Sequence, residues 1–143
     1  MARVDFYVLA EEGSDVRYRF ACRLAEKAVD QGHRVYLQTA SLAEAQRLDE
    51  LLWTFSDRSF LAHELANGNS ASHEKVMVLL GEADAPPTHR QLLINLAERL
   101  PSDVNAYERI AEIVDVDPER KRAARERFKQ YREQGCAMES HNL

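Results

Sequence analysis

The feature that most constrains the fold of this chain is a regular alternation between short apolar runs and longer amphipathic segments. The short runs are rich in β-branched and aromatic residues, which is typical of buried strands. They cover residues 3–9, 34–40, 75–81 and 109–116. The longer segments repeat their apolar residues at helical spacing over residues 14–32, 41–55 and 118–135. This alternation predicts an α/β class, single-domain, three-layer Rossmann-like fold, with a mainly parallel sheet and helices on both faces.

A few residues mark the ends of these elements. Ser41 and Glu44 form a capping box that opens the second helix, and Pro118 suits the first turn of the last one. Residues 59–64 could form a further short strand. Residues 91–97 fit either a strand or a helix, since periodicity cannot decide a short apolar run, and we favour a strand. The last few residues could be disordered.

Length and charge limit the number of domains and the kinds of partner. At 143 residues the chain has the size of one domain, so residues 1–143 are expected to form a single unit. The net charge is −5, yet residues 118–134 hold seven of the 19 lysines and arginines against three carboxylates. The rest of the chain is therefore acidic, which argues against broad nucleic-acid binding, because such binding needs many phosphate contacts. The basic segment still allows one local anion site.

The sequence also bears on where the protein works. No stretch approaches the roughly 18 apolar residues of a membrane span, and residues 1–5 lead straight into a strand-like run. Neither a membrane protein nor a secreted one is expected. The two cysteines, Cys22 and Cys136, are too few for a disulfide framework or a zinc site. We therefore expect a cytoplasmic protein.

Motifs for cofactor binding or catalysis are missing from the sequence. The loop after the first strand carries three carboxylates and one glycine over residues 10–15, and neither G-x-G-x-x-G nor a P-loop motif occurs. The five histidines are scattered without metal-ligand spacing, and no G-x-S-x-G motif is present. We therefore predict no catalytic, cofactor-binding or metal-binding residues. A small enzyme whose site assembles from distant positions stays open as an alternative.

The second helix points to one binding surface. With residues advancing about 100° each, Leu48 and Leu52 lie on the core stripe, whereas Trp53 falls roughly 140° away from Leu48. Phe60 follows just past the helix and could join Trp53 in one apolar patch. Tryptophan is enriched at interfaces, so this patch suits a protein partner. The alternative is that the chain after residue 55 folds back and buries Trp53.

The last helix points to a second surface. Arg122, Arg125, Lys129 and Arg132 form a basic stripe beside an apolar strip that contains Phe128 and Tyr131. Arginine pairs with carboxylate and an aromatic groove accepts an apolar side chain, so the surface suits a short acidic peptide with an apolar anchor. A solvated basic helix docked on the sheet is favoured by the pattern alone. A single nucleic-acid strand stacked on Tyr131 is the third option.

Several stretches of the sequence resemble a known family. They are R-L-D-E-L-L-W at 47–53 followed by S-F at 59–60, A-R-E-R-F-K-Q-Y-R at 124–132, D-F-Y-V-L at 5–9 and I-V-D at 113–115. These stretches are similar to the chi subunit family of bacterial DNA polymerase III holoenzyme. The order of the expected elements and the chain length also match that family, while residues 65–90 show little resemblance to it. The resemblance implies a non-catalytic accessory subunit associated with the clamp loader. It also implies a Rossmann-like fold without a nucleotide site.

The resemblance further implies partners and residue roles. The family pairs with the psi subunit, and Trp53 and Phe60 match its psi-facing aromatic residues. It also grips the acidic C-terminal tail of single-stranded DNA-binding protein, which ends in a phenylalanine carboxylate. A helicase-like repair protein is implied as a competitor of psi. The residues implied for tail binding are Arg125, Phe128, Lys129, Tyr131, Arg132 and Val116.

Within that implied site, Arg125 with Lys129 or Arg132 would meet carboxylates, while Phe128 and Tyr131 would line an apolar pocket with Val116 as its floor. The family often has tyrosine at position 128 and a small apolar residue at position 117, where this chain has Phe128 and Asp117. A modest affinity for the tail is therefore expected. The leading hypothesis is an adaptor that links the replicase to coated single-stranded DNA, and the alternative is a direct single-stranded nucleic-acid-binding module.

Overall fold

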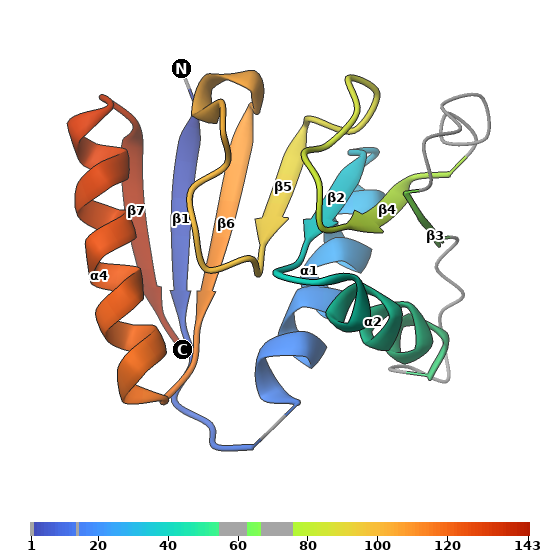
Figure 1. Ribbon diagram of the computed structural model, residues 1–143, viewed down its shortest axis with the longest axis horizontal. Coiled ribbons are helices and arrows are strands. Elements are labelled where there is room, and N and C mark those ends of the chain that lie inside the picture. The colour runs from blue at the N-terminus through green and yellow to red at the C-terminus, as the bar shows by residue number, and fades with distance from the viewer. Residues whose placement is uncertain (1, 14, 55–62, 67–75) are drawn as a thin grey trace.

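The computed structural model describes all residues except 1, 14, 55–62 and 67–75. Figure 1 shows one sheet flanked by helices, as the alternation of segments predicts. In chain order the described elements are β1 (Arg3–Val8), α1 (Val16–Asp30), β2 (Val35–Gln38), α2 (Leu42–Thr54), β3 (His63–Leu65), β4 (Val78–Gly81), β5 (Leu92–Asn95), the 3-10 turn η1 (Val104–Ala106), β6 (Arg109–Val114), α4 (Pro118–Glu133) and β7 (Ala137–Asn142).

The sheet has seven strands in the order β3-β4-β2-β5-β6-β1-β7. Every neighbouring pair is parallel, so the predicted sheet is confirmed. The strand β1 lies between β6 and β7, and its pairing with β6 sets Arg3 opposite Arg109. The first strand along the chain is thus held by the last two (Figure 1).

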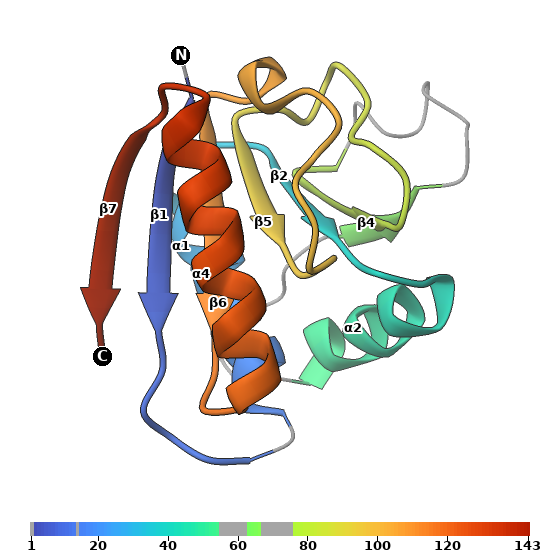
Figure 2. The same cartoon turned by 60° about the vertical axis from the view of Figure 1, so that its left-hand side comes forward.

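The helices cover both faces of the sheet. The side chains of α1 and α2 pack in one apolar core with residues of β2, β4, β5 and β6. The second core lies on the other face, where Ala124 and Tyr131 of α4 belong to one apolar cluster with Phe6, Tyr36 and Ile110 of the strands. Figure 2 shows α4 in front of β1 and β6, with α1 behind them. Alternate residues of each strand point to opposite faces, so β1 contributes to both sides of the sheet.

Side chains cap two helices as the sequence predicts. The Ser41 hydroxyl accepts a hydrogen bond from the Glu44 backbone N–H at 3.2 Å, and the Glu44 carboxylate accepts one from the Ala40 N–H at 3.1 Å. The first bond is the Ser41 half of a capping box at the start of α2, while the Glu44 carboxylate reaches one residue beyond the cap. The Asp117 carboxylate caps α4 by accepting from the Arg120 N–H at 2.9 Å, with Pro118 in the first turn. None of the described helices is long and apolar enough to span a lipid bilayer.

Two segments whose structure the sequence left open, residues 91–97 and the last few residues, both contain strands. Residues 92–95 form the central strand β5, so the favoured prediction of a strand is confirmed. The expectation that the last residues could be disordered is wrong, because residues 137–142 form β7. This strand is polar and largely exposed at the sheet edge, so it lacks the apolar run that marks buried strands. The short strand expected at 59–64 is seen as β3, while its residues 59–62 lie outside the described residues.

Candidate functional site

A buried polar network fixes α4 on the sheet. The Glu112 carboxylate, on β6, is fully buried and accepts a hydrogen bond from Arg127 Nε at 3.1 Å. Its other oxygen accepts from the Tyr131 hydroxyl at 2.7 Å and from Asn95 Nδ2 at 2.8 Å. Arg127 and Tyr131 lie four residues apart on the inner face of α4, so the network sets the rotation of this helix about its axis.

Burial dominates the electrostatics of this network. Removal from water raises the pKa of the Glu112 carboxyl, and the charge of Arg127 offsets part of that rise. The same burial, together with the neighbouring Glu112, raises the pKa of the Tyr131 hydroxyl. A buried charge pair with one partner removed leaves the other uncompensated, which is strongly destabilising. We therefore assign Arg127 and Tyr131 to holding the helix in place.

A groove of about 340 Å³ runs between the outer side of α4 and the neighbouring strands. Its floor is mainly apolar, and the Phe6 and Phe128 rings meet there with centroids 5.2 Å apart. The lining comes from β1, β6, α4 and β7 and consists of Phe6, Val8, Val114, Lys121, Ala124, Arg125, Phe128 and Ser140. An apolar floor with cations on one side can hold an apolar side chain and a carboxylate at the same time.

Some of the cationic side chains of α4 form ion pairs with neighbouring carboxylates and others do not, within the described residues. Arg120 makes a bidentate ion pair with Asp115, with N–O distances of 2.8 and 2.7 Å, and Arg122 pairs with Glu119. Arg125 is exposed at the groove and makes no ion pair within the described part of the chain. Its guanidinium is therefore available to an anionic ligand.

The structure separates the residues that the resemblance had grouped as one pocket. Arg125 and Phe128 line the groove, while Lys129 and Arg132 are exposed on α4 outside its lining. The expectation that Tyr131 lines the groove is wrong, because its ring is fully buried and its hydroxyl bonds to Glu112.

The expected floor of the groove is also corrected. Val114 lines the groove, whereas Val116 is half-buried and not part of the lining, because the chain has left β6 at residue 114. Phe6, Val8 and Ser140 were missed as groove residues. The alternation of inward and outward side chains on β1 could have identified the first two. Asp117 caps α4, so its carboxylate is already engaged.

The second candidate surface lies on α2. Trp53 has 53% of its area exposed, while Leu48 and Leu52 on the same helix are buried in the core. Its ring lies against the His63 ring of β3, with centroids 4.6 Å apart. Leu42, which is 51% exposed, lies about 20° from Trp53 around the helix axis. Phe60, predicted beside Trp53, lies outside the described residues.

Among the described residues, the two cysteines and one cluster of possible metal ligands are engaged in the fold. Both cysteines are buried, and burial raises the pKa of the Cys22 thiol to about 12, which leaves it protonated and unreactive at neutral pH. Within the described residues, one group could offer three metal ligands: Asp5, Glu139 and His141. Arg3 pairs with both of these carboxylates, so a cation there would be repelled.

Comparisons with known proteins agree with this architecture. The family model described as DNA polymerase III chi subunit, HolC, matches residues 1–139. The chain is 43% identical to DNA polymerase III subunit chi of Pseudomonas aeruginosa over all 143 residues, which cover 98% of that protein. It is 30% identical to the subunit of the same name from Haemophilus influenzae, covering 96% of this chain and 95% of that one.

Among solved structures, T4 UvsW resembles the fold with a TM-score of 0.64. Sequence identity is 8%, and the match spans 99% of this chain and 42% of the length of UvsW. At this identity the likeness concerns the fold alone. It shows that the same arrangement of strands and helices occurs in a sequence with almost no residues in common.

Proposed function

The chain belongs to the DNA polymerase III chi subunit family, and we propose that it works as a non-catalytic adaptor associated with the clamp loader of the replicase. As a chi family member it is an accessory subunit of DNA replication. In our proposal the α4 groove binds the acidic C-terminal tail of single-stranded DNA-binding protein, and the Trp53 surface pairs with the psi subunit. Such an adaptor would act in the bacterial cytoplasm, at the nucleoid through the replisome.

The observation that carries the tail-binding proposal is the combination of an apolar groove with an arginine, Arg125, that makes no ion pair with any described residue. A phenylalanine side chain at the end of the tail would pack against Phe6 and Phe128, whose rings already meet in the floor. The terminal carboxylate would then lie near Arg125, which can donate two parallel hydrogen bonds. Lys121 lines the same groove. Lys129 and Arg132 are exposed on α4 and would attract the acidic residues that precede the anchor.

The psi-pairing proposal is supported by the exposure of Trp53. A large side chain that leaves half of its area in water is expected to gain from burial against a partner. Leu42 lies on the same side of α2, about three helical turns from Trp53, so a partner that contacts both would cover most of the length of this helix. Phe60 is proposed to join this surface. A helicase-like repair protein that uses the same face would compete with psi for it.

Fluorescence anisotropy with two labelled ligands tests the adaptor. One ligand is an acidic peptide ending in a phenylalanine carboxylate, and the other is an oligothymidine strand. We expect the peptide to bind and Arg125→Ala to weaken it about tenfold or more, the size expected for losing a charge-assisted hydrogen bond. Arg122→Ala is the matched control, because Arg122 is exposed on the same helix but outside the groove lining, and it should change little.

Trp53→Ala separates the two proposed surfaces in the same experiment. Trp53→Ala should leave peptide affinity unchanged and abolish co-purification of the chain with psi. Arg125→Ala should weaken peptide binding and leave co-purification with psi unchanged. Amidation of the peptide's terminal carboxylate should weaken binding as much as Arg125→Ala does. Tight binding of oligothymidine with none of the peptide would contradict the adaptor and favour the nucleic-acid-binding module instead.

A further inference from the structure

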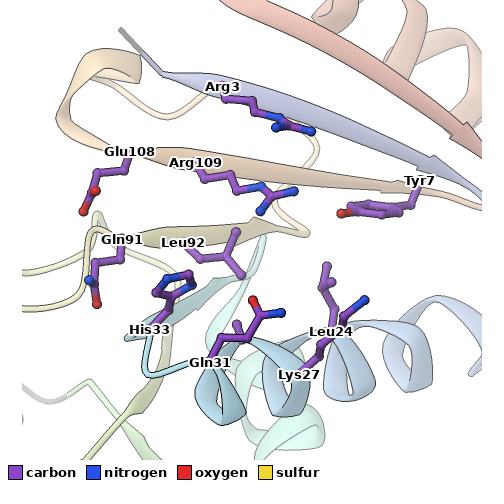
Figure 3. A pocket seen from close by; sticks show the side chains of 11 residues that line it. Arg3, Tyr7, Leu24, Lys27, Gln31, His33, Gln91, Leu92, Glu108 and Arg109 are labelled. Carbon is purple, nitrogen blue, oxygen red and sulfur yellow. The ribbon is translucent and has the colours of Figure 1, made fainter.

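A second cavity lies on the opposite face of the sheet from the α4 groove. It has a volume of about 440 Å³ and is formed by Arg3 and Tyr7 of β1, the starts of β5 and β6, and the last turns of α1 with the turn that follows. Figure 3 shows Arg3 and Arg109 reaching into it from the sheet, and Leu24, Lys27 and Gln31 facing them from the helix. This volume is within the roughly 300 to 1,000 Å³ that is typical of small-molecule sites.

Asp5 holds the two arginines at this cavity in place. Its side chain is fully buried, and it accepts hydrogen bonds from Arg109 Nε at 2.9 Å and from Arg3 Nη2 at 3.3 Å. His141 Nε2 lies 3.0 Å from the same carboxylate. Burial alone would raise the pKa of Asp5, but the hydrogen bonds with His141 and Arg109 bring it below its ordinary value. The carboxylate is therefore ionised at neutral pH and orients both guanidinium groups.

Each arginine still has donors to spare. Among the residues that the structure describes, Arg109 donates to Asp5 through Nε alone, and Arg3 donates through Nη2 alone, to Asp5 and Glu139. The side chains of Arg3 and Arg109 are 49% and 42% exposed. The remaining N–H groups of Arg109 are thus oriented by a buried partner on one side and open on the other. Such pre-orientation lowers the entropy that a ligand must overcome on binding.

Lys27 completes the cationic side of the cavity from α1. It is exposed and makes no ion pair with any residue that the structure describes. The nearby carbonyl groups at the end of α1 would repel an anion if they were free. Two of them already accept backbone hydrogen bonds, since Ala28 accepts from the His33 N–H at 2.9 Å and Val29 from the Gly32 N–H at 2.9 Å.

We propose that this cavity binds the phosphate or carboxylate group of a small organic anion, between the Arg109 guanidinium and the Lys27 ammonium. This inference goes beyond the adaptor function, which uses neither residue. Leu24, Ala28 and Leu92 give the cavity an apolar wall for the ligand's carbon skeleton. The Gln31 amide supplies a further hydrogen-bonding group, while the Gln91 oxygen is engaged, because it accepts from the Arg34 N–H at 2.7 Å. Glu108 also lines the cavity, but its carboxylate points away from the Arg109 guanidinium (Figure 3).

An NMR titration of the full chain with phenyl phosphate, benzoate, inorganic phosphate and neutral benzyl alcohol tests this proposal. We expect saturable shifts in the methyl signals of Leu24 and Leu92 with an aromatic anion and none with benzyl alcohol. Tighter binding of phenyl phosphate would assign the site to phosphates, and tighter binding of benzoate would assign it to carboxylates. Inorganic phosphate should bind more weakly than phenyl phosphate, because it cannot use the apolar wall.

Two variants and a control connect the titration to the proposed residues. Lys27→Ala and Arg109→Gln should each weaken binding about tenfold, while the spectrum itself reports that the chain is folded. Arg19→Ala removes an exposed cation of the same helix outside the cavity and should have no effect. Failure of every anion to give saturable shifts would overturn the proposal. Binding that is unchanged in both Lys27→Ala and Arg109→Gln would overturn it as well.

Discussion

The groove beside α4 and the cavity beside α1 use opposite faces of one strand. Phe6 and Val8 of β1 line the groove, and Arg3 and Tyr7 of the same strand line the cavity. The groove has an aromatic floor beside Arg125, which is exposed on α4 and makes no ion pair within the described residues, whereas the cavity has an arginine oriented by the buried Asp5. The first arrangement suits an extended peptide that brings its own anchor. The second suits a compact anion that fits prearranged donors.

The groove should depend most strongly on the buried network behind α4. Glu112→Ala is expected to lower the free energy of unfolding by about 3 to 5 kcal/mol, because it leaves a cavity and removes the acceptor shared by Arg127, Tyr131 and Asn95. Urea unfolding followed by circular dichroism measures the loss. Glu119→Ala is the matched control, since it removes an exposed carboxylate of α4 and should stay within about 0.5 kcal/mol of the wild type. Equal losses in the two variants would show that the network does not stabilise the fold.

The cavity should tolerate the loss of its buried carboxylate better. Asp5→Asn is expected to cost about 1 to 3 kcal/mol, because Arg3 and Arg109 can turn toward water once they are released. The same variant should weaken phenyl phosphate or benzoate binding and leave the tail peptide unaffected. Glu139→Gln removes only the exposed partner of Arg3 and serves as the control. A change in peptide affinity of Asp5→Asn would show that the two faces are coupled through β1.

The smallest effect we predict is on the pH dependence of stability. Acid should weaken the contribution of Asp5, on the cavity face, and strengthen that of Glu112, behind α4. The pKa of folded Asp5 lies below the ordinary value of 3.8, so the unfolded chain binds this proton first as pH falls. Its contribution to stability is present above that ordinary pKa and is lost as pH falls through the folded value. Urea midpoints measured from pH 7 down to about 3 should therefore fall less in Asp5→Asn than in the wild type.

Glu112 supplies the opposite contribution, because its folded pKa is raised. The folded state binds this proton more readily, so the contribution is present below the unfolded pKa and is lost as pH rises through the folded one. Glu112→Gln removes this titrating group, whose protonation stabilises the folded state in acid. The urea midpoint of the variant should therefore fall more steeply with falling pH than that of the wild type. Parallel curves for the wild type and both variants would contradict these assignments.

The local patterns in the sequence were sufficient to predict most of the fold. Runs such as residues 3–9 and 109–116 are apolar enough to be recognised as buried strands. The cap at Ser41 and the first-turn proline at 118 mark helix starts. The strand β7 was not predicted, because an exposed edge strand needs no apolar face. The helical pattern alone favoured a basic helix docked on the sheet, and the buried Tyr131 fits that alternative. The misplaced pocket role of Tyr131 came from the resemblance, because spacing along a helix does not show whether a ligand or the sheet covers a side chain.

The cavity shows what sequence patterns cannot provide. Arg3 and Arg109 are separated by most of the chain and become neighbours only through the parallel register of β1 and β6. Lys27 faces them because α1 packs across the same side of the sheet. Nothing in the residues around any one of the three distinguishes it from an ordinary surface cation. The burial of Arg127 is similar, because its partner Glu112 lies on another element.

The position of β1 between β6 and β7 also has a consequence for how the molecule assembles during synthesis. The first strand to be made must wait for the last two before any of its ladder hydrogen bonds can form. Closing so long a loop is costly in entropy, and non-local parallel pairing is intrinsically slow. Until then, the apolar side chains of β1 remain available to chaperones or to other nascent chains. The groove beside α4 and the cavity beside α1 therefore both form late, when β6 and β7 dock on β1.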